Sequence, residues 1–230
     1  MILHTIIFKM EELLVKIAHC VEFGKINEAS PYPPDMKGQV GADELTKQAI
    51  DEGGNPDEVL KKGLVIGMEK IGVKFRENKV FVPQVLMSAK AMSTAMEHLK
   101  PFFQSGAVRR KGVFVIGTVA GDLHDIGKNL VSMMVEGSGY EVIDLGTDVS
   151  SEKFIDAIKE HPGCYVGLSA LLTTTMVNME KIVNDIKAEM PNTKILIGGA
   201  PVSDDFKDKI SADFYSPDPQ GAVDFLNSEG

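Results

Sequence analysis

Apolar positions recur with a helical period through the first part of the chain. Leu13, Ile17 and Val21 form one stripe, which Leu14 and Ala18 widen. Residues spaced three and four apart lie on one face of a helix, so this stripe predicts an amphipathic helix with that face buried.

Three more helical segments follow. The second ends at Gly53-Gly54, the third begins at Asn55-Pro56-Asp57-Glu58, and the fourth begins at Pro83. Asn55 can cap the third helix, Pro56 suits its first position, and Glu58 can complete a capping box. The apolar positions of these segments are Leu45, Ala49 and Ile50, then Leu60, Leu64, Met68, Ile71 and Phe75, then Leu86, Ala89, Met92, Met96 and Leu99. Four amphipathic helices predict a small bundle, which we assign to residues 1–103.

Residues 25–41 interrupt the helical pattern, because Pro31, Pro33 and Pro34 exclude a continuous helix there. A connection between helices usually takes about 2–8 residues, so this one is long. We expect a solvated insertion, with docking of a partner as the alternative.

The start of the chain, residues 1–8, is apolar but short. It lacks the basic region and the cleavage site of a signal peptide. We expect it to begin the first helix, or to be an extension upstream of a natural start at Met10.

The hydrophobic period changes after residue 111. Short apolar runs predict strands at 113–117, 141–145, 164–169, 194–198 and 213–215. Helical patterns alternate with them near 126–138, 151–160, 175–190, 202–210 and 219–228. Repeated βα units predict a mostly parallel, doubly wound sheet. The expected fold class is α + α/β: a four-helix bundle, a polar linker at 104–111, and a Rossmann-like (flavodoxin-like) domain at 112–230.

Composition and charge narrow the classes of function. The chain has 230 residues, of which 43% are hydrophobic and 25% charged, as in ordinary globular proteins. A net charge of −9 argues against binding to nucleic acid or to an anionic membrane. Cys20 and Cys164 lie outside any CxxC spacing, which fits a reducing cytosol and gives no zinc signature. No apolar run approaches the ~18 residues of a membrane span, so a cytoplasmic protein is expected.

Candidate chemistry gathers where the predicted strands end. The first strand leads into Gly121-Asp122-Leu123-His124-Asp125-Ile126-Gly127, the third into Ser169-Ala170-Leu171, and the fourth into Gly198-Gly199. Carboxyl ends of parallel strands share one edge, where open α/β sheets bind ligands. Glycines there leave room for a ligand to approach the backbone. A lone histidine on such a loop more often faces water than binds a metal. The Ser169 and Gly198 blocks are therefore needed to support His124 as a ligand.

These three blocks closely resemble the cobalamin-binding domain of corrinoid methyl-transfer proteins and methionine synthase, whose pattern is Asp-x-His-x-x-Gly, Ser-x-Leu and Gly-Gly. The intervals also fit that family, since 41 residues separate Gly127 from Ser169 and 26 separate Leu171 from Gly198. The helical half is similar to the helical cap that precedes this domain, with its signature in Val80-Phe81-Val82-Pro83-Gln84-Val85.

The resemblance implies a bound cobalamin (methylcobalamin or a related corrinoid), with its own benzimidazole displaced and its nucleotide tail along the groove. His124 would be the axial cobalt ligand, Asp122 would bond the other ring nitrogen, and Thr175 would complete a proton relay. Protonation of this relay would favour loss of the histidine. Further cofactor contacts are expected from Thr118, Asp125, Ile126, Gly127, Ser169, Leu171, Thr173, Gly198 and Gly199. The segment after the last strand, Tyr215 to Gln220, is a further candidate for lining the tail.

By the same resemblance, the helical cap would shield the methyl group on cobalt. Phe75, Val82 and Val85 occupy the matching positions and would exclude water until the cap moves aside. The alternative is that all three are simply part of the core of the bundle.

The leading functional expectation is a corrinoid methyl carrier, not a complete enzyme, because a substrate barrel alone takes ~250 residues. It would serve a substrate-specific methyltransferase and an acceptor-side methyltransferase, with tetrahydrofolate or a thiol coenzyme as acceptor, and would need a reductive activating protein. The proline-rich insertion leads us toward an aryl methyl ether O-demethylase system. One alternative is a cobalamin-dependent sensor, although no helix-turn-helix or basic helix is visible. Another is the small subunit of an adenosylcobalamin mutase, which normally lacks the cap.

Overall fold

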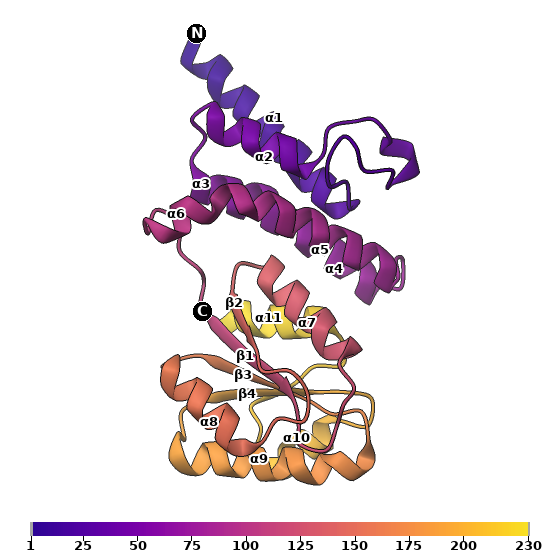
Figure 1. Cartoon of the computed structure of the whole chain (residues 1–230), viewed down its shortest axis with the longest axis vertical. Coiled ribbons are helices and arrows are strands. Elements are labelled where there is room, and N and C mark those ends of the chain that lie inside the picture. The colour runs from indigo at the N-terminus through magenta and orange to yellow at the C-terminus, as the bar shows by residue number, and fades with distance from the viewer. Residues whose placement is uncertain (1, 230) are drawn as a thin grey trace. The chain divides into compact units, whose positions relative to one another are not determined.

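The chain forms two compact units in the computed structural model, which describes residues 2–229 and their side chains from Phe8 onward (Figure 1). One unit runs up to Arg110 and includes Gly137–Gly139, and the other comprises Lys111–Glu136 and the chain from Tyr140. The change of unit at Arg110 falls within the linker expected at 104–111. The domain bounds 1–103 and 112–230 themselves stay a prediction.

The first unit is helical, as predicted. Its α-helices are α1 (Ile2–Glu22), α2 (Ala42–Asp51), α3 (Pro56–Glu58), α4 (Ile66–Arg76), α5 (Val82–Met96) and α6 (Lys100–Gln104). Short 3₁₀ turns lie at Pro34–Met36 and Glu97–Leu99. The expected third helix is a continuous run of α3, a π-helical segment (Val59–Val65) and α4.

The beginning of this third helix shows one correction to the sequence interpretation. Asn55 caps α3 as predicted, since its side chain accepts a hydrogen bond from the Asp57 N–H at 2.9 Å. Glu58 does not complete a capping box. Its carboxylate pairs with Lys62, one helical turn later, because an i,i+4 ion pair competes for the same side chain.

Two glycines set how closely the third helix packs on α1. A Cβ at Gly67 would lie 2.6 Å from the Ala18 carbonyl oxygen, and one at Gly63 would lie 3.1 Å from Ile17. Larger side chains would push the helices apart. The stripe of Leu13, Ile17 and Val21 is buried against this surface, as its period predicts.

The proline-rich segment 25–41 is anchored at its beginning. Lys25 is fully buried, and its ammonium donates to the Ser30 carbonyl at 2.9 Å. Residues 37–40 are exposed. The end of the segment is joined to its beginning, because the Ala42 N–H donates to the Lys25 carbonyl at 3.0 Å. The exposed residues lie between these ends, which agrees in part with the expected solvated insertion.

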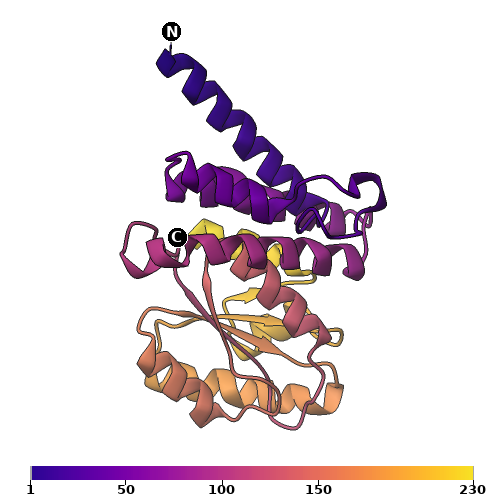
Figure 2. The ribbon, with the colours of Figure 1, turned by 45° about the horizontal axis from the view of Figure 1, so that its top comes forward.

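The second unit is a five-stranded parallel sheet, which confirms the predicted doubly wound fold. Its strands are β1 (Val113–Thr118), β2 (Glu141–Asp144), β3 (Tyr165–Ser169), β4 (Lys194–Gly198) and β5 (Phe214–Tyr215), in the order β2-β1-β3-β4-β5. Its α-helices are α7 (Ile126–Gly137), α8 (Ser151–Glu160), α9 (Met176–Glu189), α10 (Asp204–Ile210) and α11 (Pro219–Glu229), and a 3₁₀ turn spans Thr173–Thr175. Helices α7 and α11 cover one face of the sheet, and α8 and α9 cover the other (Figures 1 and 2).

The register of the sheet brings the predicted loops to one edge. Thr118, the last residue of β1, pairs with Ser169 of β3, and Ser169 pairs with Gly198 of β4. The three ends therefore lie in a row. Strands of alternating βα units all point the same way, so their carboxyl ends must meet on one side.

No helix among the described residues combines the length and the apolar composition needed to cross a membrane.

Candidate corrinoid site at the carboxyl edge of the sheet

A buried carboxylate organises the loop after β1. Asp122 has no exposed surface. Its Oδ2 accepts hydrogen bonds from the N–H groups of Leu171 and Leu172, at 2.8 and 3.2 Å, and from the Thr175 hydroxyl at 2.8 Å. Its Oδ1 accepts the His124 N–H at 3.1 Å and lies 2.8 Å from Nδ1 of the same residue. One side chain thus joins the β1 loop to the β3 loop.

These bonds keep Asp122 ionised. Burial alone would raise the pKa of its carboxyl group, because it disfavours the charged form. The bonds from Leu171, His124 and Thr175 outweigh burial and hold the pKa well below its usual range. An ionised carboxylate can only accept, so Nδ1 of His124 carries the proton.

His124 is therefore oriented as a ligand would need to be. Its side chain is 52% exposed, although Nδ1 is held by a carboxylate with no exposure. With the proton on Nδ1, the lone pair of Nε2 is available at the surface. A carboxylate that bonds the second ring nitrogen fixes the tautomer and raises the basicity of a ligating histidine.

Three further residues hold the backbone of this loop. Thr118, which is buried, donates its hydroxyl to the His124 carbonyl at 2.9 Å. The Asn178 amide donates to the Ala120 carbonyl at 2.7 Å, and Asp148 accepts the Gly121 N–H at 2.7 Å. Asn178 and Asp148 were missed from the sequence, because neither stands near His124 along the chain.

Exposed apolar side chains lie on the His124 loop and on the β3 loop that Asp122 joins to it. Leu123 is 72% exposed and Ile126 is 76% exposed, and Leu171 and Leu172 are also open to solvent. Exposed leucine and isoleucine side chains from two loops around one polar group are typical of a surface that takes a ligand. Leu123 and Leu172 were not predicted, since an apolar loop residue gives no signal of its own.

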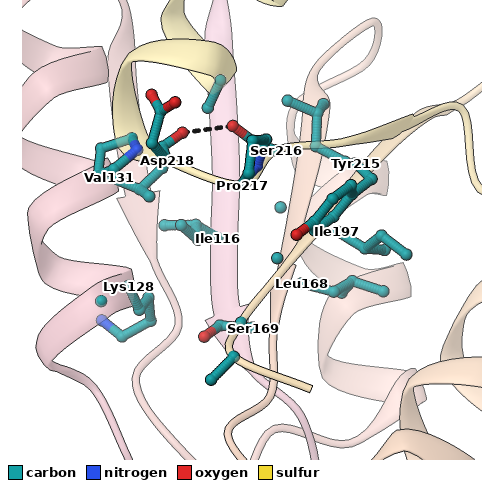
Figure 3. Close-up of a pocket in the computed structure, with 18 of the residues that line it drawn as sticks. Ile116, Lys128, Val131, Leu168, Ser169, Ile197, Tyr215, Ser216, Pro217 and Asp218 are labelled. Atoms are coloured by element: carbon teal, nitrogen blue, oxygen red, sulfur yellow. Dashed lines mark hydrogen bonds between the residues drawn. The ribbon is translucent and has the colours of Figure 1, made fainter. Parts of the chain in front are cut away.

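Beside this loop lies a cavity of about 320 Å³ (Figure 3). It is lined by β1, by the carboxyl ends of β3 and β4, by the start of α7, and by the end of β5 with the segment that follows it. Among the predicted residues, Gly127, Ser169, Gly198 and Gly199 line it. So do Tyr215, Ser216, Pro217, Asp218 and Pro219, as the sequence suggested for the segment after the last strand.

The glycines at this edge have different reasons for lacking a side chain. A Cβ at Gly127 would meet nothing within 4 Å, so the fold leaves open space there. Gly199 has a φ of +131°, and a Cβ would lie 1.8 Å from the Ala170 carbonyl oxygen. The backbone conformation requires glycine at position 199. At position 127 no atom of the protein excludes a side chain, so the requirement for glycine there would come from a bound ligand.

Comparison with known proteins identifies this arrangement. The sequence matches two families described as B12 binding domains, one over residues 112–221 and the other over residues 39–100. It is 42% identical to the dimethylamine corrinoid protein of Methanosarcina barkeri over 216 residues, which cover 93% of this chain and 95% of the relative. The chain belongs to the B12-binding corrinoid proteins. As a corrinoid protein of the kind found in methyltransferase systems, it binds cobalamin or a related corrinoid.

Other corrinoid and cobalamin-binding proteins are similar to this chain in sequence or in structure. Trimethylamine corrinoid protein 1 of Methanosarcina acetivorans is 40% identical over 178 residues, covering 76% of this chain and 82% of the relative. The methanol:cobalamin methyltransferase complex MtaBC from Methanosarcina barkeri has a chain that superposes with a TM-score of 0.79 at 29% identity, over 95% of this chain and 79% of that one. A cobalamin-binding protein from Desulfitobacterium hafniense DCB-2 gives a TM-score of 0.72 at 30% identity, over 95% and 97%.

The residues of this corrinoid protein fit the cofactor. The available Nε2 of His124, the open space at Gly127 and the apolar loop residues suit a macrocyclic metal complex with a pendant chain. Among the described residues, no three His, Cys, Asp or Glu side chains gather into a group that could hold a bare metal ion. Both cysteines are buried, which raises the pKa of each thiol to about 11.

Other predicted residues lie apart from the cavity wall. Asp125 is exposed, and its carboxylate accepts a hydrogen bond from Asn129 at 3.0 Å. Thr173 is exposed in the 3₁₀ turn before α9. In the helical unit, Phe75 on α4 and Val82 on α5 are half-buried, and Val85 is fully buried. Their contact with the cofactor stays a prediction.

The Thr175 hydroxyl provides the first testable prediction. Its single proton has two acceptors within reach, Oδ2 of Asp122 at 2.8 Å and the Leu172 carbonyl at 2.9 Å. We expect Thr175→Val to lower the free energy of unfolding of the cofactor-free protein by about 1–3 kcal/mol, because it removes a donor from a buried carboxylate. Thr175→Ser keeps the donor and should cost less than about 1 kcal/mol. Urea unfolding measures both, and equal losses in the two variants would contradict the role of the hydroxyl.

Proposed function

We propose that this protein is the methyl-carrying corrinoid subunit of a methyltransferase system. The cobalt of the bound corrinoid supplies the chemistry, since it accepts a methyl group and gives it up again. The observation that carries the proposal is the pairing of an exposed imidazole with a fully buried carboxylate, at 2.8 Å, beside an open cavity. The similarity to methylamine corrinoid proteins over most of the chain supports it.

The residues of this chain would hold and protect the reacting centre. Asp122 would hold the imidazole of His124 so that Nε2 could bind the cobalt, and the Thr175 hydroxyl donates to the second oxygen of Asp122. Because Asp122 is kept ionised, the proton would be held at Nδ1 of His124, and this hydrogen bond would affect how strongly Nε2 binds the cobalt. Leu123 and Ile126 would exclude water beside the ring. In the helical unit, Phe75, Val82 and Val85 are the candidates for covering the methyl group.

The function requires at least two protein partners. A substrate-specific methyltransferase would deliver the methyl group, and an acceptor-side methyltransferase would remove it, to tetrahydrofolate or a thiol coenzyme. A reductive activating protein would restore cobalt after accidental oxidation. The MtaBC complex is an example in which a similar chain assembles with a methyltransferase. A cytoplasmic location is part of the same proposal.

The methyl donor is the finer part of the proposal. Two similar proteins are named for dimethylamine and trimethylamine, so methylamines are the first donors to test. An aryl methyl ether, toward which the proline-rich insertion leads, is the second. Methanol, the donor of the MtaBC complex, is the third.

A methyl-transfer assay tests the function directly. The protein is loaded with cobalamin, reduced to Co(I), and mixed with each donor and a methyltransferase specific for that donor. We expect the Co(I) absorbance to disappear with one donor and return when the acceptor-side enzyme and acceptor are added. A protein that binds cobalamin but takes no methyl group from any donor, and that shifts promoter DNA in a gel, would be a sensor instead. Photolysis that releases an adenosyl group from the native cofactor would favour the mutase alternative.

A further inference from the structure

Most polar groups around the cavity beside the His124 loop already have partners within the protein. The Lys128 ammonium, on a buried side chain, is ion-paired with Asp144 and donates to the Asn129 amide. The Ser216 hydroxyl donates to the Asp218 carbonyl. These groups stabilise the cavity wall and have little capacity left for a ligand.

Two hydroxyls on the wall differ from the others. No hydrogen bond joins the side-chain oxygen of Tyr215 or of Ser169 to another of the described residues, and both side chains are half-buried. Figure 3 shows the Tyr215 ring beside Ile197, with its hydroxyl directed toward the middle of the cavity. A phenol that is half-buried and unbonded is expected to find a partner in whatever fills the cavity.

The two hydroxyls lie at different distances from His124 along the sheet. Ser169 ends β3, which pairs directly with β1, the strand that leads into the His124 loop. Tyr215 lies on β5, at the edge of the sheet, and both β3 and β4 stand between β5 and β1. A ligand anchored at His124 would therefore reach Ser169 first and Tyr215 with a more distant part.

The surroundings of Tyr215 suit a flat aromatic group. Ile116, Leu168 and Ile197 supply apolar walls, and Gly198 leaves the backbone uncovered. Cobalamin carries such a group at the far end of its nucleotide, a benzimidazole with one ring nitrogen that is not attached to the sugar. When a protein histidine takes the lower position on cobalt, this nitrogen loses its bond to the metal. In an apolar cavity it needs a donor, because an unsatisfied buried acceptor is costly.

We propose that Tyr215 selects the base of the corrinoid nucleotide by donating its hydroxyl to the free ring nitrogen of that base. The proposal rests on the corrinoid-binding function above and adds a preference within it. Cobamides whose base has a free ring nitrogen would be retained. Cobamides with a phenolic base, which have no ring nitrogen, would leave the Tyr215 hydroxyl unpaired and bind less tightly.

The test compares three ligands on three proteins. Cobalamin, p-cresolyl cobamide (a phenolic base) and cobinamide (no nucleotide) are titrated into the wild type, Tyr215→Phe and Tyr165→Phe, and dissociation constants are read from absorbance. Tyr165 is a matched control, since it lies on β3 in the same unit but outside this cavity. We expect Tyr215→Phe to weaken cobalamin binding by about two- to tenfold and to leave the other two ligands within about twofold. Tyr165→Phe should change none of them.

Each other outcome has a distinct meaning. The proposal that Tyr215 selects the nucleotide base is wrong if the wild type binds cobalamin and p-cresolyl cobamide with equal dissociation constants. It is also wrong if Tyr215→Phe keeps the wild-type ratio of their dissociation constants, or weakens all three ligands alike. If the wild type binds none of the three, the corrinoid-binding function itself fails. Tyr215→Phe keeps the ring and removes no hydrogen bond of the cofactor-free protein, so the variant is expected to fold.

Discussion

We expect His124→Ala to abolish ligation of cobalt by the protein. His124 is the residue whose Nε2 the buried Asp122 carboxylate presents at the surface. Residues that only orient a metal ligand change metal affinity by about 10–100-fold, so loss of the ligand itself should weaken corrinoid binding at least that much. The measurement is the Co(II) electron paramagnetic resonance spectrum of protein grown with ¹⁵N-histidine. The wild type should show splitting from a ¹⁵N nucleus, and His124→Ala should show none.

The labelled histidine separates the protein ligand from the nitrogen of the cofactor's own base, which carries ¹⁴N. His161→Ala is the control, because His161 lies in the same unit at the end of α8 and outside the site. It should keep the ¹⁵N splitting. Persistence of that splitting in His124→Ala would show that another histidine is the ligand and would overturn the site as described.

We expect replacements of Gly127 to separate stability from cofactor binding. A Cβ at this position meets nothing within 4 Å, and the residue is the second of α7. Gly127→Ala should therefore raise the free energy of unfolding of the cofactor-free protein by about 0.4–1 kcal/mol, because alanine has less freedom to lose. Gly127→Phe should still fold, but its ring would compete with the cofactor for the cavity and weaken corrinoid binding by about 10- to 100-fold. Thermal unfolding and cobalamin titration give the two quantities.

Gly199→Ala is the matched comparison, since Gly199 also lines the cavity. Its φ of +131° and the 1.8 Å approach of a Cβ to the Ala170 carbonyl predict loss of stability, by about 1–3 kcal/mol or more. The two glycines should thus respond with opposite signs in the cofactor-free protein. If Gly127→Ala destabilises the protein as much as Gly199→Ala does, Gly127 serves the fold, and its absence of a side chain is not evidence for a cofactor.

Much of the fold could be predicted from the sequence. The change of period after residue 111 separated helical from α/β structure, and the strand predicted at 194–198 is the observed β4. Rules for helix capping were less reliable where two hydrogen-bonding partners compete for one side chain. Glu58 can bond either its own helix start or Lys62, and only the structure shows that it pairs with Lys62. The π-helical segment Val59–Val65 was also missed, because an i→i+5 turn leaves the apolar pattern helical.

The candidate site was predictable in its side chains but not in its backbone partners. Asp122 and His124 stand two residues apart, so a motif can express their contact. The N–H of Leu171, 49 residues from Asp122, can come from any residue type and leaves no mark in the sequence. Asn178 is a polar residue visible in the sequence, but it stands 58 residues from Ala120. No local pattern therefore predicts that its amide bonds the Ala120 carbonyl.

The sequence by itself determined which residues carry the chemistry: the spacing of Asp122, His124 and Gly127, the Ser169 and Gly198 blocks, and the βα alternation that sends them to one edge. Only the tertiary structure decided that Asp122 is fully buried with its pKa held low, that the His124 side chain bonded to it is half exposed, and that Tyr215 directs an unbonded hydroxyl into the cavity. The reason is physical. Periodicity and spacing follow from the geometry of single elements, whereas burial, the state of a proton and unused hydrogen-bonding capacity depend on atoms that distant segments bring together.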